Sequence, residues 1–238
     1  MLNSDRFLAA FSAIERHLRE LTGRGKDAGF SAAVGAASKS DAAVRRFESD
    51  LREFADLRNA IVHERTDGHV LAEPNDRTVE EIERIISLLL DPPKVYKEFH
   101  GKVCSLSVGE PVGSAVRSMF EGSFSQIPIY DDGNGFQGLL TANTVARWLG
   151  ANVKDDLFSL DETSVADVFG FTEDKDNFSF LSRDSTLFEA LERFQTYESN
   201  GKRLEAILIT QTGKPSEALL GITTVWDLPR IHAIVDSP

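Results

Sequence analysis

The chain has 238 residues, of which 41% are hydrophobic and 27% charged, a composition typical of a globular protein with a buried core. Its length indicates two small domains or one large one. The net charge of −12 is uneven, because residues 1–95 carry 14 basic and 17 acidic side chains and the remainder carries 12 and 21. An acidic second part argues against a broad nucleic-acid surface there, since phosphate binding depends on cations.

The single cysteine, Cys104, excludes an intrachain disulfide and favours a reducing compartment. Charged side chains within the first twenty residues argue against a signal peptide. The densest apolar run, residues 85–90, is too short to span a bilayer. We therefore expect a cytoplasmic protein with no membrane partner. With one cysteine and no paired histidines, we expect no metal site.

The first ninety residues have helical periodicity. A first helix ends at Gly23 and Gly25, and an Ala/Gly/Ser-rich segment, 28–40, is expected to form a loop with a weak helical turn. A second helix begins after Ser40 or Asp41, includes LRNAIVHER (57–65) and ends by Gly68. A third covers 78–90. The expected buried positions are Phe7, Leu8, Phe11, Ile14, Leu18 and Leu21; Val44, Phe47, Leu51, Phe54 and Ile61; and Val79, Ile82, Ile85, Ile86 and Leu89.

The prolines of DPP (91–93) mark the predicted boundary between domains 1–93 and 94–238. Beyond it, residues 125–149 and 203–231 each predict strand, turn, strand and helix. Helices at 112–122 and 186–197 precede these two segments. Aligning Pro128 with Ile207 and Gly138 with Gly221 indicates two copies of one repeat about 80 residues apart, and two copies favour a closed pair over a solenoid.

The segments IPIYDDGNGFQGLLTANT and AILITQTGKPSEALLGITTVWD carry a resemblance to a tandem pair of CBS domains, often called a Bateman module. The resemblance implies an α+β protein in which an α-helical bundle precedes two β-α-β-β-α units. The first repeat would cover about 94–150 and the second about 163–235. It also implies that the pair senses an adenine nucleotide such as AMP, ADP or ATP.

The family pattern Gly–apolar–apolar–Thr–x–x–Asp occurs here as GITTVWD. Thr224 is expected to meet a phosphate or ribose oxygen, and Asp227, one turn later, to accept from both ribose hydroxyls. Phe178, Phe180 and Ile207 are expected to form an apolar slot for the purine. The alternative is that Thr-x-x-Asp is a capping box, which forms with or without a ligand.

The first repeat keeps Thr141 but has Thr144 where the family has aspartate. A neutral hydroxyl does not replace a carboxylate that binds two ribose hydroxyls, so we expect one nucleotide per chain. The acidity of this half favours AMP or ADP over ATP, because a polyanion needs compensating cations. The candidate cations are Arg183, Lys202 and Arg203.

The motif Arg58, Asn59 and His63 resembles the hallmark of HEPN domains. The resemblance implies a metal-independent ribonuclease that acts as a dimer. His63 would transfer the proton, Arg58 would stabilise charge on the phosphorane, and Asn59 would orient either group. Five helical positions correspond to about 500°, so the side chains of Arg58 and His63 lie roughly 140° apart and need a loosened helix or a second protomer to converge.

The alternative is a solvated helix end, with His63 favouring the negative dipole and Arg58 pairing with Glu53, Asp56 or a neighbouring helix. The sequence therefore predicts an adenine-nucleotide-binding regulatory protein whose CBS pair controls a HEPN-like domain, 1–93, in a homodimer. One alternative is a ribonuclease of the HEPN class that nucleotide regulates and that binds RNA at its first domain. The other is a non-catalytic, nucleotide-sensing dimerisation protein.

Overall fold

The structure is a computed structural model that describes residues 2–23, 29–63, 65–66, 69–70, 73–153 and 159–236, with the side chains of 63–70 outside the description. It divides into two compact units. The first comprises 1–93 with 186–192 and 230–238, and the second comprises 94–185 with 193–229. This division differs from the linear one expected at residue 93, because two segments from the second repeat belong to the first unit.

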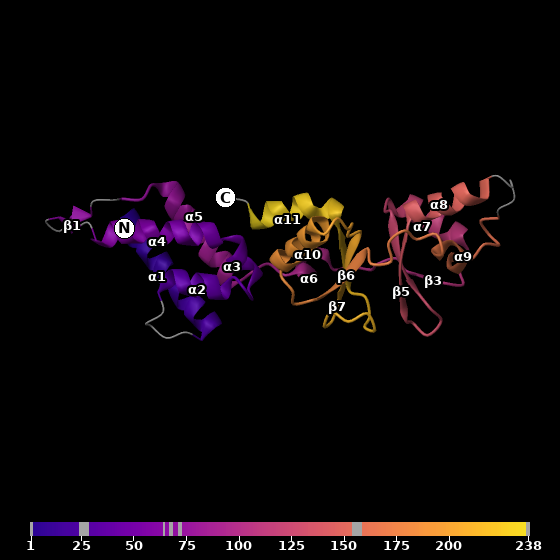
Figure 1. Cartoon of the computed structure of the whole chain (residues 1–238), viewed down its shortest axis with the longest axis horizontal. Helices are drawn as coiled ribbons and strands as arrows, with labels where there is room; N and C mark the ends of the chain where they lie inside the picture. The colour runs from indigo at the N-terminus through magenta and orange to yellow at the C-terminus, as the bar shows by residue number, and fades with distance from the viewer. Residues whose placement is uncertain are drawn as a thin grey trace. The chain divides into compact units, whose positions relative to one another are not determined.

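Helices build most of the first unit (Figure 1). Helix α1 contacts α2, α4 and α5. Arg6 on α1 binds Glu83 on α5 through two hydrogen bonds of 3.0 and 2.7 Å, so a paired guanidinium joins these helices. The elements are α1 (Asn3–Thr22), α2 (Phe30–Ala37), α3 (Ala42–Arg46), α4 (Glu48–His63), the antiparallel strands β1 (Arg65–Thr66) and β2 (His69–Val70), and α5 (Asp76–Leu90).

The predicted periodicity places most of the expected core correctly in this unit. Only two of the expected positions are not buried, since Leu8 is half-buried and Leu21 is 45% exposed. Gly23 ends α1 with a φ of 63°, a conformation that costs glycine little. Asn75 begins α5, where its side chain accepts a hydrogen bond from the Thr78 amide at 2.9 Å.

The segment 28–40 was predicted as a loop with a weak helical turn, whereas residues 30–37 form a regular helix, α2. The buried residues of α2 are Ala33, Val34 and Ala37, whose small side chains give weak periodicity but let helices approach closely. The helix expected from residue 41 onward is also interrupted at Phe47, which separates α3 from α4. The ring of Phe47 lies edge-on to Phe188, with centroids 5.6 Å apart, a tertiary contact that local sequence does not encode.

The second unit contains the same sheet topology twice. In each sheet the first strand pairs parallel to the second, and the second pairs antiparallel to the third. The first repeat runs through β3 (Leu106–Ser107), α7 (Val112–Gly122), β4 (Gln126–Tyr130), β5 (Phe136–Thr141) and α8 (Ala142–Asn152). The second runs through β6 (Phe178–Ser182), α10 (Leu187–Ser199), β7 (Ala206–Thr210), β8 (Gly221–Thr224), the 3₁₀ turn η2 (Val225–Asp227) and α11 (Leu228–Val235).

Strand pairing gives the alignment of the two repeats. Gln126 pairs with Thr141 in the first sheet, and Ala206 pairs with Thr224 in the second, so Gln126 and Ala206 are equivalent. Pro128 therefore corresponds to Leu208, one residue from the predicted alignment with Ile207. Turns of different length hide this register in the sequence, whereas backbone pairing fixes it.

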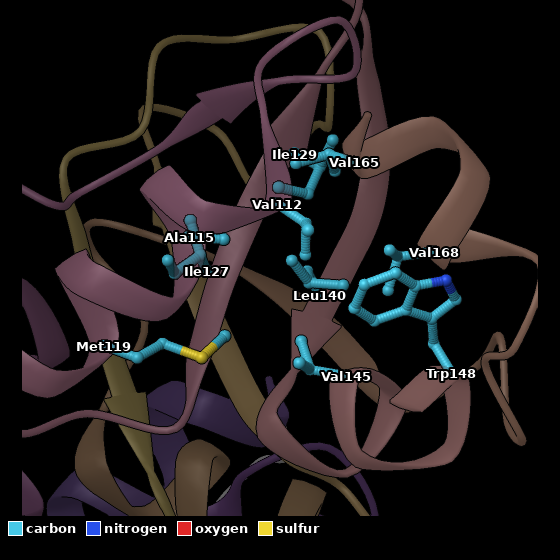
Figure 2. Packing of buried hydrophobic residues seen from close by; sticks show 10 residues of the cluster. All are labelled: Val112, Ala115, Met119, Ile127, Ile129, Leu140, Val145, Trp148, Val165 and Val168. Carbon is cyan, nitrogen blue, oxygen red and sulfur yellow. The ribbon is translucent and has the colours of Figure 1, made fainter. Parts of the chain in front are cut away.

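The two sheets meet through an apolar cluster of Leu139, Ala206 and Leu208. The ring centroid of Phe136 on β5 lies 4.9 Å from that of Phe178 and 5.1 Å from that of Phe180 on β6. Figure 1 shows α7, α8 and α9 (Val165–Phe169) together on one side of the first sheet. Figure 2 shows the core between them, where Trp148 lies beside Leu140 and Val168.

Each repeat packs a short preceding helix on the other repeat. Helix α6 (Val95–Phe99), which precedes β3, contacts β8, and α9, which precedes β6, packs into the core of the first repeat. A glycine lies at each crossing. A Cβ atom on Gly221 would be 2.1 Å from the Phe99 carbonyl oxygen, and one on Gly138, whose φ is 144°, would be 3.0 Å from the Phe169 ring. This exchange makes the two repeats a closed pair.

Candidate functional site

A pocket of about 840 Å³ in the second unit contains the predicted Thr224 and Asp227. Three separate segments form its walls: the chain before β3, the end of α7 with the start of β4, and the turn from β8 into η2. Its volume lies within the range of small-molecule sites. The lining residues are Lys102, Val103, Cys104, Met119, Phe120, Ser123, Phe124, Ser125, Gln126, Ile222, Thr224, Trp226 and Asp227.

Asp227 forms the predicted capping box with Thr224. Its Oδ2 atom accepts hydrogen bonds from the Thr224 amide at 2.8 Å, from the Thr224 hydroxyl at 3.2 Å and from the Thr223 hydroxyl at 3.3 Å. Among the described residues, every donor to this carboxylate uses Oδ2. The cap and a ligand are therefore compatible, because Oδ1 retains its acceptor capacity while Oδ2 holds the backbone.

Gly221, the first residue of the motif, positions the opposite wall. The peptide of Phe99 and His100 lies against it, with His100 and Gly221 forming an isolated antiparallel bridge. The Gly101 amide donates to the Leu220 carbonyl at 3.1 Å. The chain leaving this contact becomes residues 102–104 of the pocket, so the glycine brings Lys102 to the site.

Two aromatic side chains of the pocket are unusually exposed. Phe120 at the end of α7 is 85% exposed, and Trp226 in η2 is 79% exposed. These are the highest values among the large hydrophobic residues that the structure describes. Sequence reasoning missed both, although an apolar residue within the Thr-x-x-Asp turn is a signal that could have identified Trp226.

The residues of the predicted purine slot, Phe178, Phe180 and Ile207, do not line this pocket. The strand order in the second sheet is β6-β7-β8, so β6 lies at the edge away from Thr224. Its two phenylalanines pack against Phe136, and Ile207 is fully buried. The apolar wall comes instead from residues such as Met119, Phe124 and Ile222.

Thr141 and Thr144 line a second pocket, which is equivalent by register but holds only about 90 Å³. The two hydroxyl oxygens lie 3.0 Å apart and bond each other. Glu173 accepts a hydrogen bond from the Asn143 amide at 2.9 Å and forms an ion pair with Arg147. The chain's own side chains thus occupy the polar groups around this pocket.

None of the three predicted cations lines the large pocket. The guanidinium of Arg183 lies 4.4 Å from the centroid of the Tyr96 ring. Lys202 pairs with Asp176 at 3.5 Å, and Arg203 pairs with Glu205 at 3.0 Å. In the described part of the chain, Lys102 is the one Lys or Arg among the lining residues of the large pocket.

In the first unit, Arg58 and Asn59 line a pocket of about 510 Å³ together with Glu15, residues 29–32 and neighbouring apolar side chains. Arg58 Nη1 donates to Asn59 Oδ1 at 3.2 Å. This bond takes the place of the expected pair with Glu53 or Asp56. His63 is the last residue of α4, and its side chain lies outside the described residues.

Within the described ranges, no three His, Cys, Asp or Glu side chains are grouped as a metal ion would require. No helix in the same ranges combines the length and apolarity needed to cross a membrane.

Comparison with known proteins returned no matching family model and no matching curated protein. Similar solved structures are CBS-domain proteins. They include the CBS-domain containing protein ATU1752 from Agrobacterium tumefaciens (15% identity, 57% of this chain, 87% of that chain, TM-score 0.42). The CBS domain of a membrane protein from Sphaerobacter thermophilus (14%, 64%, 95%, 0.47) and CBSX2 in complex with AMP (14%, 60%, 98%, 0.43) are further examples.

Proposed function

We propose that the chain is a regulatory protein whose CBS pair binds an adenine nucleotide in the large pocket. The observation that carries this proposal is the combination, in one pocket of about 840 Å³, of Asp227, Thr224 and Lys102 with an apolar wall. The free oxygen of Asp227 suits a ribose diol, Lys102 suits a phosphate, and the apolar wall suits a base.

The charge of the lining favours AMP over ADP and ATP. Lys102 is the single Lys or Arg in the described lining, and Asp227 opposes it with a negative charge. A monophosphate is matched by one cation, whereas each further phosphate adds charge that the pocket does not neutralise. The second pocket, at about 90 Å³, is too small for a nucleotide, which supports one ligand per chain.

Calorimetric titration of the purified full chain with AMP, ADP and ATP tests this proposal. We expect a stoichiometry near one and the highest affinity for AMP. Mass spectrometry of small molecules released from freshly purified protein gives an independent identification. Absence of binding by all three nucleotides would refute the proposal.

Control of the helical domain is proposed to pass through α11. The chain runs from Asp227 directly into this helix. At the other end, Arg84 Nη1 of α5 donates to the Val235 carbonyl at 2.9 Å, and Arg46 at the end of α3 binds Asp236 at 2.8 Å. A ligand that shifts the start of α11 would therefore act on contacts with α3 and α5.

The lowered pKa of Asp236 keeps its carboxylate ionised, which favours the ion pair with Arg46. Burial alone would raise the pKa of this carboxyl, but hydrogen bonds from Arg46 and His232 outweigh burial and hold the pKa below the usual value of an aspartate. Asp236 is therefore charged near neutral pH, and its contact with Arg46 persists there.

The second candidate function is the metal-independent ribonuclease that nucleotide would regulate. The observation in its favour is that Arg58 and Asn59 are hydrogen-bonded and line one pocket with Glu15. A guanidinium held in a pocket suits a phosphodiester, and His63 would supply the proton transfer from the end of the same helix. A homodimer would bring two such motifs together, and the protein would act in the cytoplasm.

RNA cleavage without metal, measured on wild type and on Arg58→Ala and His63→Ala, tests this candidate. Arg52→Ala is a matched control, because Arg52 lies on the same helix and pairs with Glu48 at 2.7 Å. Cleavage lost in the first two variants and kept in the control supports a ribonuclease. If light scattering detects a dimer that does not cleave RNA, the result supports the non-catalytic dimerisation protein. If light scattering detects a monomer, the result contradicts the proposed homodimer.

A further inference from the structure

A buried glutamine lies in the wall of the large pocket. Gln126 opens β4, and it is only 7% exposed. The next residues along this strand that face the core, Ile127 and Ile129, are fully buried. In the second repeat the equivalent position is Ala206, so this sheet architecture does not require an amide there. Burying an amide is unfavourable unless its polar atoms find partners.

The oxygen of this side-chain amide has a hydrogen-bond partner within the protein. The Ser125 hydroxyl donates to Gln126 Oε1 at 2.6 Å. The oxygen retains a second lone pair, and no described residue accepts a hydrogen bond from Nε2. The side chain therefore offers an acceptor beside a donor at a pocket wall, which suits a ligand edge that presents a donor beside an acceptor.

We propose that Gln126 reads the edge of the base and selects a purine that carries an amino group beside a ring nitrogen, as adenine does. This inference rests on the proposed nucleotide site. The exocyclic amino group would donate to Oε1, and Nε2 would donate to the adjacent ring nitrogen, the two-point pairing that glutamine makes with adenine in nucleic acids. A 6-oxo purine places an oxygen against Oε1 and loses the pairing.

The exposed aromatic side chains complete this arrangement. Phe120 and Trp226 line the same pocket and are largely exposed, and an exposed aromatic ring is the kind of surface on which a planar base stacks. Stacking holds any base with little regard to its identity, so it supplies affinity without selection. Gln126 supplies the selection, because only the edge distinguishes one purine from another.

Titration of the full chain with AMP, inosine monophosphate and ribose 5-phosphate tests the assignment. Wild type should prefer AMP over inosine monophosphate by about 5- to 150-fold, the range that a two-point base contact provides. Gln126→Leu should abolish that preference and leave ribose 5-phosphate affinity unchanged. Gln137→Leu is the control, because Gln137 is exposed on β5 and bonds Asp131, and it should keep the preference.

Equal affinity of wild type for the two nucleotides overturns base reading by Gln126, and this comparison needs no variant to fold. A preference that survives in Gln126→Leu overturns it too. In both cases the nucleotide site itself stands if Asp227→Ala weakens both ligands. Failure of wild type to bind either nucleotide would refute the proposed function and this inference together.

Discussion

Replacing Asp227 by alanine separates the two roles that this carboxylate has been given. As a cap, Asp227 holds the turn between β8 and α11 through Oδ2. As a ligand-binding group, it would accept ribose hydroxyls through Oδ1. A cap affects folding with or without nucleotide, whereas a ligand contact affects only the nucleotide-bound state. The two roles therefore predict different changes in the same variant.

The magnitudes follow from the contacts. Of the hydrogen bonds to Oδ2, the one from the Thr224 amide is short, at 2.8 Å, and the hydroxyl bonds, at 3.2 and 3.3 Å, are weaker. Their loss should lower the free energy of unfolding by about 1–2 kcal/mol. Loss of the charge-assisted bonds to ribose should weaken nucleotide binding by about 1–3 kcal/mol, or roughly 5- to 150-fold.

The chain contains a matched control in the capping box of Ser164 and Asp167 at the start of α9. There the Ser164 amide and hydroxyl donate to Asp167 Oδ2 at 3.1 and 2.6 Å. Asp167 is not among the residues that line the large pocket. Asp167→Ala therefore removes a cap of the same design without touching the proposed ligand.

Thermal unfolding with and without AMP, combined with calorimetry, distinguishes the outcomes. Both variants should unfold at a lower temperature than wild type without ligand. Only Asp227→Ala should also lose the rise in unfolding temperature that AMP produces. Equal loss of AMP binding in both variants, or full AMP binding by Asp227→Ala, would contradict the assignment of Asp227 to the ribose.

Four further outcomes are expected. AMP should quench or shift tryptophan fluorescence in wild type but not in Trp226→Leu, because the other tryptophan, Trp148, is only 4% exposed and lies in the core. An unchanged wild-type spectrum would argue against a base at Trp226. Gly221→Ala should destabilise the protein by about 1–3 kcal/mol and weaken AMP binding in calorimetry, because a methyl group there would lie 2.1 Å from a backbone oxygen of α6. A Gly221→Ala variant as stable as wild type would contradict this contact. Arg46→Ala should leave AMP affinity nearly unchanged while reducing any AMP effect on the helical domain, measured by hydrogen exchange or RNA cleavage. Since the pKa of Asp236 is lowered, its pair with Arg46 should stabilise the protein above about pH 4 and lose this contribution as the pH falls further, so the stability difference between wild type and Arg46→Ala should shrink in acid.

The sequence predicted the structural features that depend on residues close together along the chain. The spacing of apolar residues predicted α1 and α5, and alternation between turn residues and apolar runs predicted β4, β5, β7 and β8. The Thr224–Asp227 turn was predicted both as a cap and as a site, and its capping geometry is present. These features depend on residues within one or two turns of each other, so the local sequence determines them.

The short range of these sequence patterns also explains the errors in predicting the helical part. Alanine and glycine carry little hydrophobic contrast, so residues 28–40 gave no periodic signal, yet their small size suits the close packing of α2 against α1 and α4. The break at Phe47 accompanies a ring contact with Phe188, which is far away in sequence. Packing between distant segments overrides local propensity at such positions.

The composition of the pocket was decided by tertiary structure alone. The sequence determined that GITTVWD forms a strand, a cap and a helix start, because these depend on neighbours along the chain. It did not determine that Lys102, Phe120 and Gln126 would face that turn. Strand order placed β6 at the far edge and removed Phe178 from the site, while the crossing of α6 at Gly221 brought in residues 102–104. Register and crossing are set by the pairing of whole strands, and no local run of residues specifies that pairing.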